Sequence, residues 1–402
     1  MKDKKYIICK KNEQIMSLLL HGNRLISAHV EEDEGSLVGN IYIAKVRNIS
    51  PAIQAAFVEI KPGQTCFLAL SDARQPILTN RNYDGRVLSG DDIVVQINKD
   101  AAKTKQPMVT TNISLSGKYC VISSGRPGVS YSAKLSSKAK KRIEQALLPE
   151  SPYLPEGFGA VIRTNAKDLE DYSPLLTEWK FLLDRLTEII RTAASRTCYS
   201  LLHKDPADYL LRLRDAYTGA YEEIVTDDED IYDDVMEYSR LHPDFSLPGV
   251  RLYEDELLPL SKLYAIDTKL KEALSKKVWL KSGGYLIIEP TEALTVIDVN
   301  TGKAASRRDN EATFFHMNIE AAEEIAHQLI LRNLSGIIII DFINMRLKEN
   351  QLQLMSYLGN LLKKDAVKTS LVDMTALGLV EITRMKISKP LKEQIEESKW
   401  NL

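Results

Sequence analysis

The sequence has 402 residues, of which 44% are hydrophobic and 27% are charged, and its formal net charge is -2. A chain of this length and apolar content is expected to fold into two to four domains, each with its own core. The balanced charge excludes a uniformly basic nucleic-acid binder, so any site for a polyanion must be a local patch.

Targeting signals are missing from the sequence pattern. No apolar run approaches the roughly 18 to 20 residues of a membrane helix, and the first residues lack the apolar core of a secretion signal. The four cysteines are scattered, without a C-x-x-C pair, which is typical of reduced thiols. We therefore expect a soluble cytoplasmic protein.

The first half of the chain changes its periodicity twice. Residues 40–70 alternate apolar and polar side chains between turn signals and, with 91–100, predict a small antiparallel β-barrel. Residues 113–207 mix strand-like and helical patterns, which indicates an α+β arrangement. Residues 208–273 alternate again and end with helical spacing.

The last part of the chain predicts an α/β layer. From residue 283 the order is two strands, a helix, a strand, a helix and two more strands. Asn318 is the expected N-cap of the first helix, and Ser335 and Gly336 are expected to end it. The apolar stripe of this helix should lie on the sheet and comprises Ile319, Ala322, Ala326, Leu329, Ile330 and Leu334. The run "IIIIDFINM" that follows predicts a central strand covered on both faces.

Two expected strands of this layer each deliver one aspartate, Asp298 and Asp341. Ligands bind at such strand ends in open α/β sheets, and two nearby carboxylates favour Mg²⁺ or Mn²⁺. Asn300 shares the face of Asp298 and could hydrogen-bond a ligand carboxylate. The alternative is that both aspartates merely start turns. Basic side chains in the next loop could hold phosphates or simply be solvated: Lys303, Arg307 and Arg308.

Three ordered motifs carry a resemblance to a known family. The stretches "GGYLIIEPTEALTVIDVNTGK", "NIEAAEEIAHQLILRNLSGIIIIDFINM" and "LGLVEITR" strongly resemble the catalytic half of the ribonuclease E/G family of bacterial endoribonucleases. The rest of the chain resembles the family more weakly. The resemblance implies five parts: a split RNase H-like subdomain (1–34 and 208–273), an OB-fold (35–112), a 5′-sensor region (113–207), a DNase I-like catalytic domain (274–395) and a C-terminal tail (396–402).

The resemblance also implies a reaction. In the family, the aspartates matching Asp298 and Asp341 bind a magnesium ion that activates water for phosphodiester cleavage, and the asparagine matching Asn300 orients the second aspartate. Glu292 matches a residue that supports the site. The implied substrate is single-stranded, A/U-rich RNA, cut to 5′-phosphate and 3′-hydroxyl ends during RNA processing or decay.

Further positions match the family's RNA-binding residues. Phe57 and Phe67 fall on base-stacking positions and Lys105 on their basic partner, while Lys45 and Arg47 could extend a basic track. From the pattern alone, both phenylalanines fit the core of a small barrel equally well.

Five residues match a pocket for a 5′-monophosphate, which would stimulate cleavage. Arg163 and Thr164 supply a cationic fork and a hydroxyl, and Gly117 and Val121 line the pocket. Lys368 stands where relatives can carry arginine, so bidentate geometry is lost and sensing could weaken. Without the resemblance, an ordinary surface ion pair is the simpler interpretation of Arg163.

The sequence departs from the family at two places. Asn344 replaces a second aspartate that commonly follows Asp341, which removes a negative charge near the site. The cysteine segment that links family protomers through zinc is absent, so no structural zinc is expected and any dimer would rest on apolar surface.

Two other classes of protein predict different sequence features. A non-catalytic RNA-binding paralogue would lose the metal ligands, which this chain retains. A nucleotide-binding α/β enzyme would need a glycine-rich phosphate loop after a strand, whereas "SGG" at 282–284 is short and precedes its strand.

Overall fold

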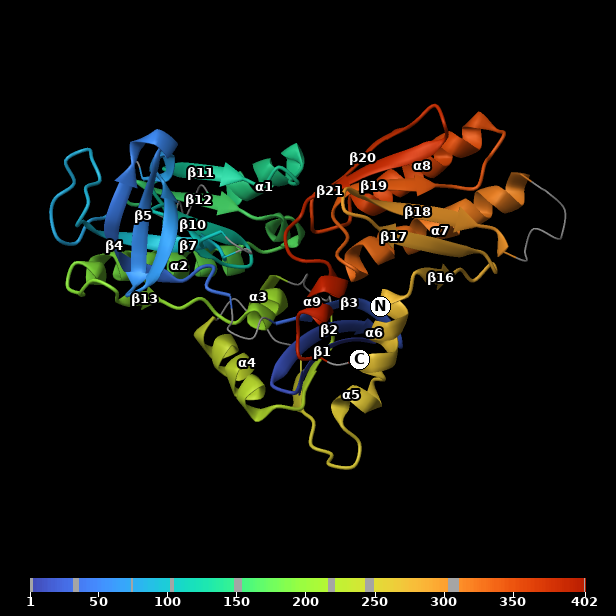
Figure 1. The fold of residues 1–402 in the computed structure, drawn as a ribbon, viewed down its shortest axis with the longest axis horizontal. Coiled ribbons are helices and arrows are strands. Elements are labelled where there is room, and N and C mark those ends of the chain that lie inside the picture. The colour runs from blue at the N-terminus through green and yellow to red at the C-terminus, as the bar shows by residue number, and fades with distance from the viewer. Residues whose placement is uncertain are drawn as a thin grey trace. The chain divides into compact units, whose positions relative to one another are not determined.

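The computed structural model describes residues 3–31, 36–73, 75–101, 105–147, 154–215, 221–242, 249–302, 311–400 and 402. The chain forms two compact units (Figure 1). Unit 1 comprises Met1–Asp33, Gly219–Tyr232 and Pro248–Leu402, and unit 2 comprises Glu34–Thr218 and Asp233–Leu247. The predicted class, a multidomain mixture of α/β and α+β parts, is confirmed.

Unit 2 contains the predicted barrel, which consists of five strands closed by pairing between its first strand and β7. Aliphatic side chains such as Val46, Val58 and Leu68 fill its interior. This closed barrel is consistent with an OB-fold. In sheet order its strands are β4 (Ile41–Ser50), β5 (Ala55–Lys61), β6 (Gln64–Ala69), β8 (Met108–Thr110) and β7 (Asp92–Lys99), with β13 (Leu201–His203) added at β4 and the short helices η1 (Pro51–Ile53) and η2 (Leu70–Asp72) in the connections.

The rest of unit 2 is a four-stranded sheet packed against a long helix, which confirms the expected α+β arrangement. The helix α2 (Ser173–Ala193) buries one apolar face on this sheet. The sheet order is β11 (Gly128–Tyr131), β12 (Phe158–Ile162), β10 (Cys120–Ser124) and β9 (Ser114–Ser116). Shorter helices accompany them: α1 (Ser137–Leu147), η3 (Thr164–Asp168) and α3 (Asp208–Asp215).

The first sheet of unit 1 joins strands from distant parts of the chain. Its order is β15 (Gly249–Leu252), β14 (Glu223–Thr226), β1 (Lys4–Lys11), β2 (Gln14–His21) and β3 (Arg24–Val30), and β1 runs parallel to β14. Side chains from α6 (Ile266–Leu274) and α9 (Leu391–Glu396) complete its core, which also buries Trp400. Unit 1 also contains α5 (Leu260–Leu263), while α4 (Glu229–Leu241) begins in unit 1 and continues into the part of unit 2 that starts at Asp233.

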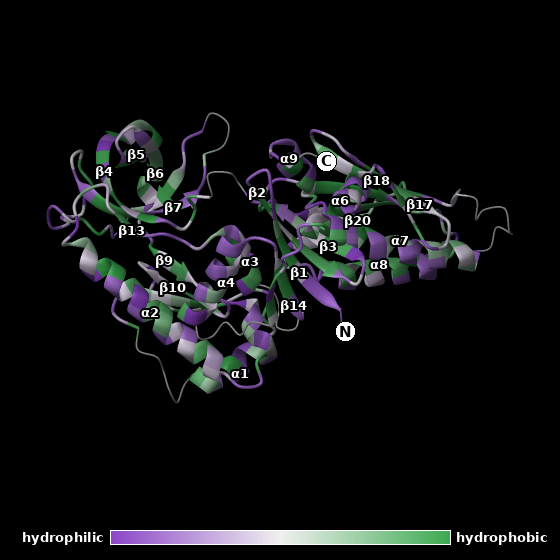
Figure 2. Cartoon of the chain, turned by 90° about the horizontal axis from the view of Figure 1, so that it is seen from below, coloured by the Kyte–Doolittle hydropathy of each residue, from purple (hydrophilic) through white to green (hydrophobic). Residues whose placement is uncertain are grey.

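The second sheet of unit 1 contains the predicted α/β layer, and the expected order of elements from residue 283 is confirmed. The sheet order is β16 (Lys277–Trp279), β17 (Tyr285–Pro290), β18 (Leu294–Asn300), β19 (Gly336–Asp341), β21 (Leu379–Arg384) and β20 (Thr369–Met374). Helices α7 (Glu311–Leu331) and α8 (Lys348–Leu362) pack on one face of this sheet. Figure 2 shows the mixed hydropathy along these helices, as expected for elements with one buried face. No helix in the described residues is long and apolar enough to cross a membrane.

The prediction that the strand 336–341 is covered on both faces was wrong. Ile338 and Ile340 are fully buried under the helices, whereas Ile337 is 50% exposed and Asp341 is exposed. Four consecutive isoleucines suggest burial on both sides, yet alternate side chains of a strand point to opposite faces. We call the face that carries Ile337 and Asp341 the open face of the sheet.

The predicted start and end of α7 were also wrong. The described helix begins at Glu311, so Asn318 lies in its interior, where it is fully buried. The helix ends at Leu331, before Ser335 and Gly336, and Asn333 adopts a left-handed conformation with a φ of 49°. The amides of Asn333 and Leu334 close the end on the carbonyl oxygens of residues 330 and 329, both at 3.1 Å.

The predicted stripe of α7 is only partly the buried one. Ala322 and Leu329 are buried in the core under the sheet, but Ile330 is 37% exposed. Leu334 is buried, although it lies beyond the end of the helix.

Candidate active site

The two predicted aspartates are direct neighbours across parallel strands. Asp298 of β18 pairs in register with Asp341 of β19, at the carboxyl end of each strand. Ile297 and Ile340 are buried on the helix side, so both aspartates project from the open face. Adjacent strands lie about 5 Å apart, which allows one small cation to bind both carboxylates.

Asn300 lies beside this pair. Its Nδ2 donates a hydrogen bond to Oδ2 of Asp298 at 2.7 Å. The two residues are two positions apart on one strand and therefore share its face. The resemblance implies that this asparagine orients the second aspartate, whereas the contact in the structure fixes the first.

A loop following Asp341, residues 342–347, is held by two residues of α7: Asn318, which the sequence analysis placed at a helix start, and Glu311, which it did not single out. Asn318 donates from Nδ2 to the carbonyl oxygen of Ile343 at 2.8 Å and accepts from its amide at 3.0 Å. Glu311 accepts from the amides of Arg346 at 3.0 Å and Leu347 at 2.9 Å, and these bonds lower the pKa of its carboxyl. For Asn318, the sequence signal for this role was a polar side chain on the otherwise apolar, buried face of the helix.

The other predicted residues of the catalytic half lie at different distances from the pair. Asn344 is exposed in the same loop and lies close to Gly378, in the turn before β21. Glu292 is exposed in the turn before β18, at the opposite end of that strand from Asp298. Six residues of extended strand span about 20 Å, so the structure does not bring Glu292 to the aspartates. Lys303, Arg307 and Arg308 lie outside the described residues.

Phe57 and Phe67 lie outside the core of the barrel. They are cross-strand partners, and their rings meet edge to face with centroids 6.1 Å apart. Both are half-buried, while the adjacent Val58 and Cys66 point into the barrel and are completely buried. Two aromatic rings are therefore available on the outer surface of the barrel, which is the requirement for stacking bases.

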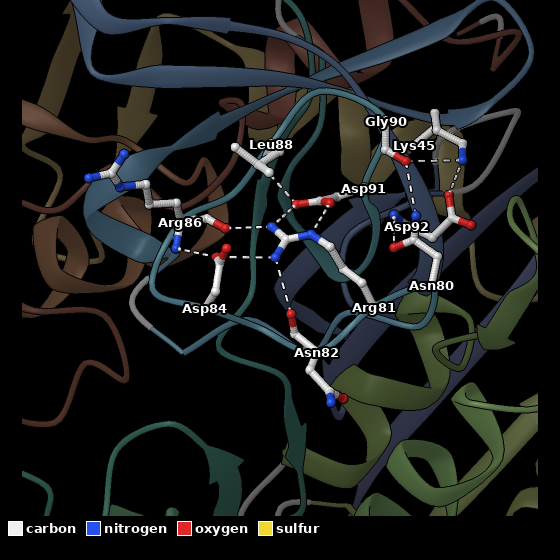
Figure 3. Close-up of polar contacts among 10 residues, drawn as sticks. All are labelled: Lys45, Asn80, Arg81, Asn82, Asp84, Arg86, Leu88, Gly90, Asp91 and Asp92. Carbon is white, nitrogen blue, oxygen red and sulfur yellow. Dashed lines mark hydrogen bonds and ion pairs between the residues drawn. The ribbon is translucent and has the colours of Figure 1, made fainter.

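The basic residues expected beside these rings are mostly paired with acids. Lys45 forms an ion pair with Asp92, which raises the pKa of the lysine (Figure 3). The Nε of Arg47 donates to Glu59 at 2.7 Å. Lys105 is exposed and has no ion-pair partner among the described residues. Much of the positive charge of this surface is therefore neutralised locally.

The loop next to Lys45 is held by a network around one arginine, drawn in Figure 3. Arg81 donates to both carboxylate oxygens of Asp91, at 2.6 and 2.8 Å, and to the carbonyl oxygen of Arg86 at 2.6 Å. Asp91 is buried, and its carboxylate also accepts from the amide of Leu88 at 2.7 Å. The Arg81 guanidinium is therefore fully engaged by Asp91 and the loop, whereas the exposed guanidinium of Arg86 has no contact drawn in Figure 3.

Arg163 makes the ion pair that was the simpler interpretation of its sequence. Its two terminal nitrogens donate to the two oxygens of Asp215, each at 2.8 Å. Burial alone would raise the pKa of Asp215, but the hydrogen bonds and charges of Arg163 and Arg214 outweigh it and lower that pKa. The adjacent Thr164 hydroxyl contacts the hydroxyl of Ser132 at 3.0 Å.

A second carboxylate shapes the predicted phosphate pocket. Glu178 of α2 is buried and accepts hydrogen bonds from the amides of Lys118 at 2.6 Å, Tyr119 at 2.8 Å and Cys120 at 2.7 Å. A side chain at Gly117 would collide with this carboxylate, since an added Cβ would lie 2.2 Å from it. Val121 is half-buried beyond this turn, and Lys368 is exposed in unit 1. Carboxylates thus occupy the amides and the guanidinium that a phosphate would need.

Fold and site together define a multidomain α/β protein with a closed β-barrel and a paired-carboxylate site at strand ends. The model of the Ribonuclease E/G family matches residues 114–387. The chain is 35% identical to ribonuclease G of Escherichia coli strain K12 over 94% of its own length and 78% of that protein. It is 34% identical to ribonuclease G of Haemophilus influenzae, covering 95% of this chain and 79% of the relative.

A longer relative, ribonuclease E of Escherichia coli strain K12, is 32% identical over 95% of this chain and 37% of that protein. The chain therefore belongs to the ribonuclease E/G family, and the resemblance inferred from the motifs is confirmed.

Proposed function

We propose that this protein is a magnesium-dependent endoribonuclease that cuts single-stranded, A/U-rich RNA to 5′-phosphate and 3′-hydroxyl ends. The observation that supports it most strongly is the register pairing of Asp298 with Asp341 on the open face, in a chain that belongs to a family of ribonucleases. Its place of action is the bacterial cytoplasm, in the processing or decay of RNA.

The donor set fits a hard divalent cation. Within the described residues, no group of three or more histidine, cysteine, aspartate or glutamate side chains could hold a metal ion. Asp298 and Asp341 therefore offer a cation carboxylate oxygens only. Mg²⁺ is commonly held by one or two carboxylates and keeps several waters, and Mn²⁺ accepts the same ligands. Asp298 and Asp341 would hold the cation, which would lower the pKa of a bound water and offset charge on the phosphate.

The residues of the chain prepare this chemistry by their placement. Two hydrogen-bonded strands fix the backbone of Asp298 and Asp341, and Asn300 holds the Asp298 carboxylate in one orientation. Such preorganisation reduces the reorganisation needed as charge develops on the phosphate. In the overall hydrolysis, a water oxygen bonds to phosphorus, the bond to the 3′ oxygen breaks, and the proton lost by water is balanced by the new 3′ hydroxyl.

The barrel supports a single-stranded substrate. Phe57 and Phe67 expose ring surface outside the barrel core, and Lys105 carries a charge without an acidic partner in the described residues. Unpaired bases can stack on such rings, whereas bases of a duplex remain stacked on one another.

Stimulation by a 5′-monophosphate belongs to the same proposal, in a weak form. A phosphate would have to displace Asp215 from Arg163 before the guanidinium could bind it. Lysine at position 368 also lacks the fork that arginine would offer. We therefore expect only a small preference for 5′-monophosphorylated RNA.

One experiment distinguishes the proposed endoribonuclease from the alternative, a non-catalytic RNA-binding paralogue. Single-turnover cleavage of a 5′-labelled A/U-rich oligonucleotide, with mapped product ends, is measured against magnesium concentration for the unmodified protein and for Asp298→Asn. We expect magnesium-dependent cuts with 3′-hydroxyl ends that the substitution abolishes. Absence of cleavage by the unmodified protein at any magnesium or manganese concentration would favour the paralogue.

A further inference from the structure

We call the second sheet of unit 1 the catalytic sheet, after the function proposed for it. Its open face carries an aromatic cluster beside the aspartates. It consists of Lys277 and Trp279 of β16 and Tyr285 of β17. The Trp279 and Tyr285 rings meet with centroids 5.4 Å apart at an interplanar angle of 64°. The Lys277 ammonium lies 3.9 Å from the Trp279 ring centroid and 3.7 Å from that of Tyr285.

The strand register places this cluster in line with the catalytic residues. Trp279 pairs with Tyr285, and Tyr285 pairs with Asn300 on the next strand. Lys277 pairs with Ile287, which in turn pairs with Asp298. At about 5 Å per strand, Tyr285 lies about 5 Å from Asn300, and Lys277 about 10 Å from Asp298. That range suits a nucleotide adjoining one bound at the aspartates.

The cluster is accessible and its charge is available. Trp279 is 64% exposed, although it is the largest side chain type and sits on a regular strand. Lys277 has no ion-pair partner within the described residues, in contrast to its neighbour Lys276, which pairs with Glu289. An exposed cation–π contact stabilises a fold by only about 0.5 to 1 kcal/mol. This contribution to stability does not explain why most of the Trp279 side chain is left open to solvent.

The backbone next to the cluster is closely packed. Gly302, two residues beyond Asn300, has a φ of +58°, and an added Cβ would lie 2.5 Å from the carbonyl oxygen of Gly283 and 3.6 Å from Cδ1 of Tyr285. The chain leaving the catalytic strand therefore passes against the edge of the Tyr285 ring without a side chain of its own.

We propose that Trp279 and Tyr285 form a nucleobase-stacking subsite for a nucleotide next to the scissile phosphate, and that Lys277 binds an adjoining phosphate. The inference rests on the proposed function and extends it, because it assigns substrate binding to the catalytic sheet itself. Stacking on a ring face accepts any base, so the subsite positions the RNA rather than reading its sequence.

Tryptophan fluorescence provides a test that does not depend on cleavage. The chain has three tryptophans, and Trp179 and Trp400 are each only 1% exposed, so Trp279 is the accessible one. Asp298→Asn protein is titrated with an A/U-rich oligonucleotide, and the same titration is repeated with Trp279→Phe added. We expect quenching that follows binding and disappears with Trp279→Phe. Binding without quenching, or equal quenching in both proteins, would overturn the proposal.

Kinetics provide the second test. Trp279→Ala should lower kcat/KM on single-stranded RNA about 5- to 150-fold, the range for losing one stacked base. Leu352→Ala is the matched control, because Leu352 is 63% exposed on α8 and lies away from the open face, and it should leave kcat/KM unchanged. An abasic nucleotide scanned along the substrate should slow the unmodified protein at one position next to the cut and add nothing to Trp279→Ala.

The outcomes separate the two levels of the proposal. If Asp298→Asn abolishes cleavage but Trp279→Ala cuts normally, the stacking subsite is refuted and the endoribonuclease assignment stands. If Asp298→Asn cuts at the normal rate, the catalytic assignment itself fails.

Discussion

Two surfaces of this protein each carry a pair of aromatic rings, but they differ in whether the nearby basic side chains are paired with acids. On the barrel, Phe57 and Phe67 meet edge to face across antiparallel strands, and on the catalytic sheet Trp279 and Tyr285 do the same. Each pair has basic side chains nearby. Lys45 and Arg47 of the barrel are held by Asp92 and Glu59, whereas Lys277 has aromatic rings as neighbours and no carboxylate partner in the part of the chain that the structure describes.

The difference shows that residue type alone does not identify a phosphate-binding surface. A lysine or arginine contributes to polyanion binding by releasing counterions, and an adjacent carboxylate cancels much of that contribution. We therefore expect the barrel to bind RNA mainly through stacking, with the charge of Lys105 added, and the catalytic sheet through stacking combined with the charge of Lys277.

The largest expected effect comes from removing the paired aspartates of the catalytic sheet, which the barrel surface lacks. Asp298→Asn and Asp341→Asn should each reduce single-turnover cleavage at least about 100-fold, because each removes a charged ligand from the pair. RNA affinity measured without metal should be retained, and thermal unfolding should show an unchanged or slightly more stable fold, since two facing carboxylates repel each other. Loss of RNA binding by either variant would mean that the aspartates support structure rather than catalysis.

The second prediction removes the rings of the barrel. The double variant Phe57→Ala with Phe67→Ala should weaken single-stranded RNA binding by a few kcal/mol, at about 1 to 3 kcal/mol per stacked base. Binding is measured by fluorescence anisotropy in the Asp298→Asn background, so that the RNA stays intact. Leu352→Ala serves again as the exposed control, and unchanged affinity in a folded double variant would exclude these rings from the RNA path.

The third prediction sharpens the comparison of charge. Lys277→Gln should reduce the slope of log affinity against log salt by about 0.7, the value for one phosphate contact on a single strand. Arg47→Gln should change that slope less, because Glu59 already neutralises this guanidinium. Glu59→Gln should strengthen RNA binding, since it leaves Arg47 without its acid. Equal slopes for Lys277→Gln and Arg47→Gln would remove the distinction between the two surfaces.

The smallest effect concerns the 5′ end of the substrate. Arg163→Ala with Thr164→Val should erase any preference for 5′-monophosphorylated over 5′-triphosphorylated RNA while slow internal cleavage continues. Asp215→Asn should instead increase the preference, because it frees the Arg163 guanidinium. Cleavage rates of both substrates are compared for the three proteins, and equal rates on both ends for all of them would show that the pocket does not act on phosphate.

The Arg163–Asp215 pair also predicts how the stability of the fold depends on pH. The folded state lowers the pKa of Asp215 below its unfolded value near 3.8, so the pair contributes stability above that pH and loses it as the pH falls through the folded pKa. Asp215→Asn should therefore lower the thermal midpoint at pH 7 more than at pH 3.

Local pattern predicted much of this molecule. The alternation and turn residues of 40–70 predict the barrel strands, and the elements after residue 283 follow the predicted order, because both depend on short-range periodicity. The strand β16 escaped prediction since three residues are too few to show a period. The register that aligns Asp298 with Asp341 is a long-range property of the fold. From the sequence we could expect only that the two strand ends lie near each other.

The misplaced residues have partners that lie far away in the sequence. Asparagine is a favoured N-cap, so a local rule placed Asn318 at a helix start, whereas its partner Ile343 lies on the other side of β19. The acids that pair with Lys45 and Arg163 likewise come from other elements. Periodicity cannot show which charges a fold brings together.

The parallel pairing of β1 with β14 determines which part of the protein can fold first while the chain is being synthesised. Lys5 has its partner at Glu223, so the first sheet of unit 1 cannot form while the ribosome is still making the residues between them. Most of unit 2, residues 34–218, emerges in that interval and can fold as the chain grows. Until β14 has been made, the β1 edge of the nascent β1–β2–β3 segment lacks its partner strand, and such an open edge can pair with other strands.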